Sequence, residues 1–88
     1  MKTDFSFEVY VQAKLRLLFP EGRMFAFVDS QLNHYKFWQI FQEDERHVVT
    51  RWGRIGKKPQ TSVQSVWDPK RFIEQKIKEK LKKGYVEV

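Results

Sequence analysis

The fold is decided by a short stretch that reads Arg51-Trp52-Gly53-Arg54-Ile55-Gly56. Side chains alternate between the two faces of an extended strand, so Trp52 and Arg54 are expected to point the same way. Gly53 lies between them on the opposite side, shared with Arg51 and Ile55, and leaves that side nearly bare. Glycine also lets another group approach the backbone closely. A large indole beside guanidinium groups and glycines therefore indicates a contact surface rather than an ordinary core strand.

The composition places this stretch in a small basic domain. The chain has 88 residues, which suits a single domain that buries about 60–65% of the surface of its unfolded chain. Hydrophobic residues make up 41% and aromatic residues 16%, so a compact core is expected and disorder is not. The formal net charge is +6, which favours polyanionic partners.

Several classes of protein are disfavoured by the sequence. Cysteine is absent, which excludes disulfides and thiolate metal sites. No apolar run approaches the length of a membrane span and no secretory leader is evident, so a cytoplasmic protein without membrane contact is expected. His34 and His47 lack partners at metal-binding spacing, and no catalytic triad, carboxylate pair or phosphate-binding glycine loop is evident. We therefore expect no metal, no cofactor and no enzymatic activity.

Residues 1–22 are expected to extend the sheet at its N-terminal side. Residues 4–11 alternate between apolar and polar side chains, which is typical of a half-buried strand. A helix that starts there remains an alternative, because Phe7, Val11, Leu15 and Leu18 also have helical spacing. Residues 19–22 read Phe-Pro-Glu-Gly and predict a turn.

The middle of the chain predicts an antiparallel meander. Strands are expected at residues 24–28, 35–42, 48–55 and 61–67. A polar loop, an acidic turn and a basic loop join them at residues 29–34, 43–46 and 56–60. Trp38 and Trp67 are both expected in the core, and residues 85–88 are expected to form a short edge strand.

A single helix is predicted over residues 69–82. Asp68 is suited to the N-cap, Pro69 to the first helical position and Gly84 to the position after the C-cap. Trp67 and Phe72 are spaced as a hydrophobic staple. The stripe expected on the sheet consists of Phe72, Ile73, Ile77 and Leu81. The lysines between residues 76 and 83 are interpreted as a solvated face, because Glu–Lys pairs four residues apart accompany them.

Three motifs together resemble the WGR domain, a family named for its Trp-Gly-Arg triplet. They read Lys36-Phe37-Trp38, Arg51-Trp52-Gly53-Arg54-Ile55-Gly56 and Lys83-Gly84-Tyr85-Val86-Glu87-Val88. The resemblance runs from about residue 24 to residue 88. It divides the chain into an N-terminal extension, 1–22, and a WGR-like domain, 23–88. WGR domains occur in poly(ADP-ribose) polymerases, in molybdate-metabolism regulators and as small bacterial proteins.

The resemblance implies an α+β fold, in which one C-terminal helix packs across an antiparallel sheet. It also implies DNA contact, because in the polymerase members the motif tryptophan packs against a sugar near a strand terminus. The motif arginine there joins the domain to its neighbours. The chain departs from the family at Pro59, where the polymerase members usually have glycine, and in the loop before Lys36, where only Asn33 remains of an Asn-rich run. No polymerase activity is implied.

We therefore expect a module that contacts duplex DNA near ends or breaks. The candidate contacts are Trp52, Arg54, Arg51, Lys57, Lys58, Lys36, Asn33 and Tyr85. The alternatives for single residues are a core position for Trp52 and, for Arg54, an ion pair with the acidic turn at residues 43–46. The alternative for the whole protein is a protein-interaction domain that uses the same Trp/Arg surface. RNA remains open as the nucleic acid, and a monomer is the default expectation.

Overall fold

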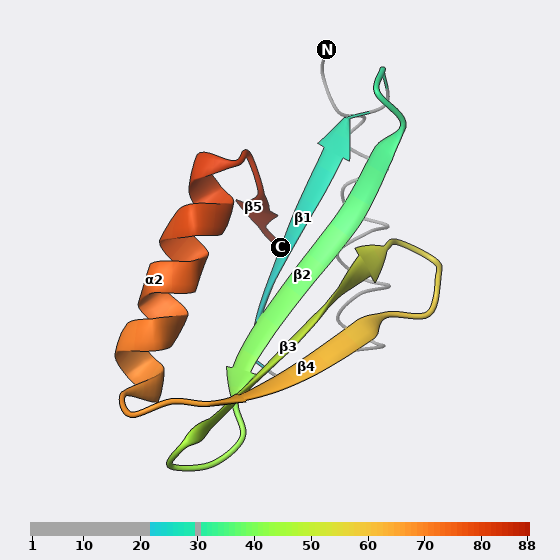
Figure 1. Ribbon diagram of the computed structural model, residues 1–88. Coiled ribbons are helices and arrows are strands. Elements are labelled where there is room, and N and C mark those ends of the chain that lie inside the picture. The colour runs from blue at the N-terminus through green and yellow to red at the C-terminus, as the bar shows by residue number, and fades with distance from the viewer. Residues whose placement is uncertain (1–21, 30) are drawn as a thin grey trace.

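The structure is a computed structural model that describes residues 22–29 and 31–88, and these form a sheet covered by a helix (Figure 1). The described strands are β1 (Arg23–Asp29), β2 (His34–Gln42), β3 (His47–Arg54), β4 (Gln60–Ser65) and β5 (Val86–Glu87). They form one antiparallel sheet in the order β4-β3-β2-β1-β5, and α2 (Pro69–Lys82) lies against one face of it. The predicted α+β fold is confirmed. The strand predicted at residues 4–11 lies outside the described residues, as does the turn predicted at residues 19–22 except for Gly22.

The strand register decides which side chains lie under α2. Trp38 on β2 is opposite Phe25 on β1 and opposite Trp52 on β3. Residues directly opposite each other in an antiparallel pair share a face, so these three aromatic side chains lie on one side of the sheet. That side is the helix side, because Phe25 and Trp38 form one core cluster with Ile77 of α2. Alternation along β3 then places Arg54 on the helix side as well, so it shares the face of Trp52 as predicted.

The core under α2 differs from the predicted stripe at one end of the helix. Ile77 is 5% exposed, whereas Phe72 and Ile73 are half-buried against the same cluster. Leu81 is 49% exposed, so the prediction that it belongs to the buried stripe is wrong. One turn beyond Ile77, the side chain that lies over Trp38 and Tyr85 is that of Lys80 rather than that of Leu81.

The prediction of a core position is confirmed for Trp38 and wrong for Trp67. Trp38 is 5% exposed and packs 5.7 Å from the ring of Phe25. Trp67 is 85% exposed, because β4 ends at Ser65 and the chain has already left the sheet. The Trp67 ring lies 4.4 Å beneath the guanidinium carbon of Arg46, which is a cation–π contact on the surface.

Both ends of α2 are capped as the sequence predicts. The Asp68 side chain accepts a hydrogen bond from the backbone N–H of Arg71 (3.2 Å). After Lys83, the N–H of Gly84 bonds to the Leu81 carbonyl and the N–H of Tyr85 to the Lys80 carbonyl, both at 3.1 Å. These two bonds form a Schellman motif, and Gly84 supplies its positive φ of 98°. The motif reverses the chain, so that β5 pairs with β1 and Tyr85 comes to lie next to Phe27.

Within the described residues, no helix is long and apolar enough to span a membrane.

Candidate nucleic-acid interface

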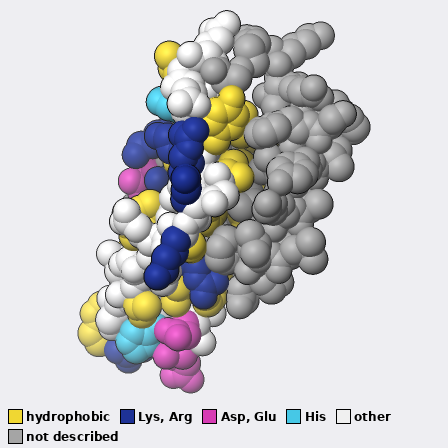
Figure 2. Space-filling view, turned by 90° about the vertical axis from the view of Figure 1, so that its right-hand side faces the viewer, with side chains coloured by type: hydrophobic (Ala, Val, Ile, Leu, Met, Phe, Trp, Pro, Cys, Tyr) yellow, Lys and Arg dark blue, Asp and Glu magenta, His cyan; other side chains and the backbone are white. Residues whose placement is uncertain are grey.

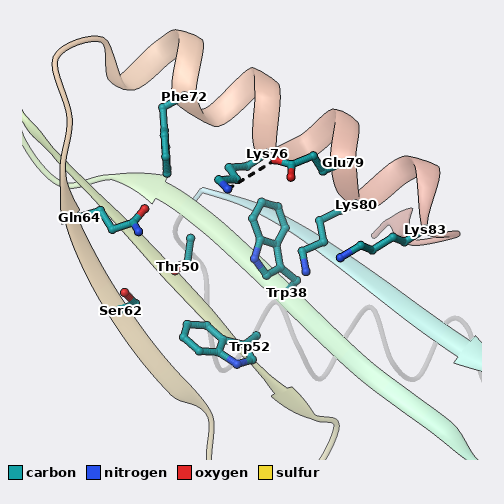
Figure 3. A pocket seen from close by; sticks show the side chains of 10 residues that line it. All are labelled: Trp38, Thr50, Trp52, Ser62, Gln64, Phe72, Lys76, Glu79, Lys80 and Lys83. Atoms are coloured by element: carbon teal, nitrogen blue, oxygen red, sulfur yellow. Dashed lines mark ion pairs between the residues drawn. The ribbon is translucent and has the colours of Figure 1, made fainter.

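Trp52 lies where the motif strand faces α2. Its side chain is half-buried, because part of the indole packs against the core cluster of Trp38 and Ile77. The rest of the ring lines a groove of about 340 Å³ between α2 and the sheet, seen from close by in Figure 3. The expected core position therefore describes one part of the ring, and the contact role of the part that lines the groove stays a prediction.

The groove, called here the helix–sheet groove, has a polar floor and a basic wall. The floor is lined by side chains of β2, β3 and β4: Trp38, Thr50, Trp52, Ser62 and Gln64. The wall is lined by side chains of α2 and its C-cap: Phe72, Lys76, Glu79, Lys80 and Lys83. In Figure 3, the side chains of Phe72 and Lys80 reach down from the helix toward the floor. Within the described chain, Glu79 is the one carboxylate that lines this groove.

The lysines of the wall correct the prediction of a purely solvated face. Lys76 and Lys80 are half-buried, and Lys80 lies over the rings of Trp38 (5.4 Å) and Tyr85 (5.1 Å). Lys76 pairs with Glu79 at 3.5 Å, and Lys83 is exposed at the groove end. The signal in the sequence is the spacing of residues 76, 80 and 83, which places them on one side of a helix. Lys78 and Lys82 are exposed as predicted, and Lys70 is exposed as well.

Positive charge is concentrated around Lys80. Burial lowers the pKa of Lys80 below its usual range, and the neighbouring charge of Lys83 lowers it further. Lys36 and Lys76 act in the same direction, whereas the carboxylate of Glu79 raises the pKa. Three other lysines and one carboxylate thus surround Lys80, so an anion bound there would meet an excess of positive charge.

A second hollow of about 330 Å³ adjoins the helix–sheet groove. It is lined by Phe27, His34, Lys36, Lys80, Lys83 and Tyr85, and it shares Lys80 and Lys83 with the first. Tyr85 is half-buried beside Phe27, and burial raises the pKa of its phenol. The two predicted contacts Lys36 and Tyr85 thus lie in the same hollow.

Arg54 is held by the loop before β2. Its guanidinium donates to the Asn33 backbone carbonyl (3.2 Å) and to Asn33 Oδ1 (3.1 Å), and it lies 5.4 Å from the ring of Tyr35. The alternative of an ion pair with the acidic turn is wrong, because that turn joins β2 and β3 at the opposite end of β3. Lys36 is directly opposite Arg54 in the sheet, so Arg54, Asn33 and Lys36 lie close together.

Arg51 lies on the other face of the sheet from Trp52. Its guanidinium contacts Gln39 Oε1 at 3.5 Å and lies 5.2 Å from the ring of Phe41. Gln39 is fully buried, so Arg51 is half-buried against a polar part of the interior. The structure therefore separates Arg51 from the other candidate contacts.

Lys57 and Lys58 lie in the exposed loop that follows Arg54. The loop begins as a tight turn, in which the Lys57 N–H donates to the Arg54 carbonyl (3.0 Å). This loop lies on the right-hand side of Figure 1, and Figure 2 shows the molecule from that side. Lys and Arg side chains lie along the middle of the described face. Several carboxylates lie at the lower end of that face, and another lies beside the basic side chains at its upper left.

The histidines have local roles in this structure. His47 Nδ1 lies 2.7 Å from Asp44 Oδ1 in the turn between β2 and β3. His34 lies 5.8 Å from the ring of Phe27. Among the described residues, no three His, Cys, Asp or Glu side chains are grouped to hold a metal ion.

The comparisons with known proteins agree with this geometry. The family model described as the WGR domain matches residues 22–88. A solved structure of a Bacteroides fragilis protein is similar to this chain with 33% sequence identity and a TM-score of 0.67. The similarity covers 75% of this chain and 19% of that one, so the chain spans about a fifth of the length of this relative. The comparison with curated proteins finds no match.

Proposed function

Because this chain belongs to the WGR domain family, we propose that it is a binding module for duplex DNA near ends or breaks, without catalytic activity of its own. WGR domains are non-catalytic modules, and those of poly(ADP-ribose) polymerases generally bind nucleic acid. The proposal assigns the sugar or base contact to Trp52. It assigns phosphate contacts to Lys36, Lys57 and Lys58.

The observation that carries the proposal is the setting of Trp52. One part of its indole is held by the core, and the rest lines a groove whose wall carries three lysines. A fixed aromatic surface beside ammonium groups suits a nucleotide, which joins a flat base and sugar to a phosphate. Arg54 is held by Asn33 on the same face of the sheet, so the charged group next to Trp52 is also fixed in position.

The preference for ends follows from the difference between the two kinds of contact. Phosphates repeat uniformly along a duplex, so contacts to them carry no information about position. Bases inside a duplex are stacked on both sides and leave no flat surface open to an indole. At a terminus, the last sugar and base are open, and stacking on an aromatic ring contributes about 1–3 kcal/mol per base.

The test is competition between a linear duplex and a closed circular duplex of the same sequence, at one salt concentration. We expect the wild type to prefer the linear form and Trp52→Ala to lose most of that preference, while binding through the lysines persists. Trp67→Ala is the matched control, because it removes an exposed indole that does not line the groove. Equal preference for ends in the wild type and Trp52→Ala would refute the role of Trp52.

The second candidate is a protein-interaction domain that uses the same surface. It is favoured by the fixed geometry of Arg54 beside Trp52, because Trp and Arg are enriched among residues that dominate protein interfaces. The salt dependence of binding distinguishes the two candidate functions. Binding to DNA phosphates weakens log-linearly as salt rises, whereas a packed protein interface has no such steep dependence.

A further inference from the structure

We propose that the helix–sheet groove binds an unpaired DNA strand that continues from the duplex terminus, so that overhanging ends bind more tightly than blunt ends. This inference rests on the proposed function, because it adds a site for the overhang to a surface that binds the end. The lysine wall holds the phosphates, and the floor contacts the bases.

The size of the groove favours a single strand over a duplex. Its volume of about 340 Å³ lies at the lower end of the range of small-molecule sites, about 300–1,000 Å³. A duplex, whose major groove alone is about 12 Å wide, is too thick to enter it. One nucleotide with its neighbouring phosphates is of the right scale. The adjoining hollow of about 330 Å³ extends the path for a second nucleotide.

The spacing of the wall lysines suits successive phosphates. Lys76, Lys80 and Lys83 are four and three residues apart on α2 and its C-cap. A helix rises 1.5 Å per residue, so the backbone positions of these lysines span about 10 Å along the axis. A stacked strand advances about 3.4 Å per nucleotide, so the row covers about three nucleotides, and fewer of an extended strand.

The side chains of the groove floor can contact a base of any type. Thr50, Ser62 and Gln64 make no side-chain hydrogen bond to another residue in the described part of the chain. Hydroxyl and carboxamide groups both donate and accept, so they can meet the edge of any base. Trp52 lies beside them and offers its ring to the face of a base. We therefore expect tolerance of sequence in the overhang.

The electrostatics of the wall also point to an anion. Lys80 lies between two hollows, and the pKa of its ammonium is lowered by burial and by Lys83, Lys36 and Lys76. A phosphodiester in the groove would neutralise this repulsion. Lys36 extends the basic path toward Arg54, since the two residues are directly opposite in β2 and β3. The groove is thereby connected to the end of the sheet that carries the motif.

The experiment measures the affinity of the full chain for a blunt duplex and for the same duplex with a single-stranded overhang of about four nucleotides, the lower limit of known single-strand sites. One triple variant changes the groove lysines, Lys76, Lys80 and Lys83, to Gln. The matched control changes Lys70, Lys78 and Lys82 to Gln, so it removes the same charge from the exposed side of the same helix.

We expect the wild type and the control triple to prefer the overhang, and the groove triple to lose that preference. The salt slope of binding to the overhang substrate should flatten by about two units in the groove triple, since each single-strand phosphate contact contributes about 0.7. If the groove triple does not fold, as judged by circular dichroism, Lys83→Gln at the exposed end of the row replaces it and should flatten the slope by about 0.7.

Three results would overturn the inference, and they are distinguishable. Equal affinity of the wild type for both substrates would refute a site for the overhang and leave the proposed binding of ends intact. Equal losses in the groove triple and the control triple would show that the lysines act only through net charge. Failure of the wild type to bind any of the duplexes at low salt would refute the proposed function and the inference together.

Discussion

Replacement of Ile77 by Ala should loosen the attachment of α2 to the sheet. Ile77 is 5% exposed and packs in one cluster with Phe25, Trp38 and Ile40. Apart from Pro69 at its start, it is the one buried residue of this helix. Its side chain is therefore the buried apolar contact of α2 with the sheet, and the half-buried Phe72 and Ile73 pack beside it.

The magnitude follows from burial. Truncation of a buried Ile to Ala costs about 2–5 kcal/mol, because transfer free energy is lost and a cavity remains. A domain of this size has a total stability of about 4–13 kcal/mol, so the loss is a large part of it. At an m-value of about 1.5 kcal/mol/M, a loss of about 3 kcal/mol lowers the midpoint of urea unfolding by about 2 M.

Leu81→Ala is the matched control for this measurement. Leu81 belongs to the same predicted stripe but is 49% exposed. Its truncation to Ala therefore loses only about half of the transfer free energy of a buried Leu and leaves no closed cavity. We expect a loss of about 1 kcal/mol and a midpoint shift of about 0.7 M. Urea unfolding followed by circular dichroism measures both variants. Equal shifts for Ile77→Ala and Leu81→Ala, or an unchanged midpoint for Ile77→Ala, would refute this account of the helix–sheet contact.

Three further predictions concern loops and turns. The double variant Lys57→Ala, Lys58→Ala should flatten the slope of log K against log salt for duplex DNA by about two units, because each phosphate contact contributes about 0.9. An unchanged slope in this variant would exclude the β3–β4 loop from the interface. Gly84→Ala should lower the melting temperature more than Gly56→Ala. Both glycines have positive φ, but only at Gly84 would a Cβ lie 3.0 Å from the ring of Phe27 on β1. Equal melting temperatures of the two variants would contradict the crowding at Gly84. The pKa of the Asp44 carboxyl is lowered, first by a hydrogen bond from the backbone of Arg46 and then by one from the side chain of His47. The stabilisation from this carboxylate is therefore present above about pH 4 and is lost as pH falls through the lowered pKa. The unfolding midpoint of Asp44→Asn should therefore depend less on acid pH than that of the wild type.

Much of the fold was predictable because its signals are local. The bounds of α2 were predicted at both ends, since Asp68, Pro69 and Gly84 act through the backbone of their own turns. The shared face of Trp52 and Arg54 was predictable for the same reason, because alternation is a property of any extended strand. The strand ends were predicted to within about two residues. β4 ends two residues earlier than expected, because its chain leaves the sheet after Ser65.

The sequence by itself therefore determined which segments are strands and helix, which residues alternate, and that the chain is a WGR domain with a basic surface. Only the tertiary structure decided which exposed-looking lysines line a groove, which tryptophan is buried and what holds Arg54. Trp38 and Trp67 have similar local signals, yet Trp38 packs in one core cluster with Phe25 and Ile77, and Trp67 lies beyond the end of its strand. Lys80 is set apart from Lys78 by the presence of Trp38 and Tyr85 beneath it. Burial and electrostatic environment depend on what lies opposite a side chain, and the register of distant strands determines that.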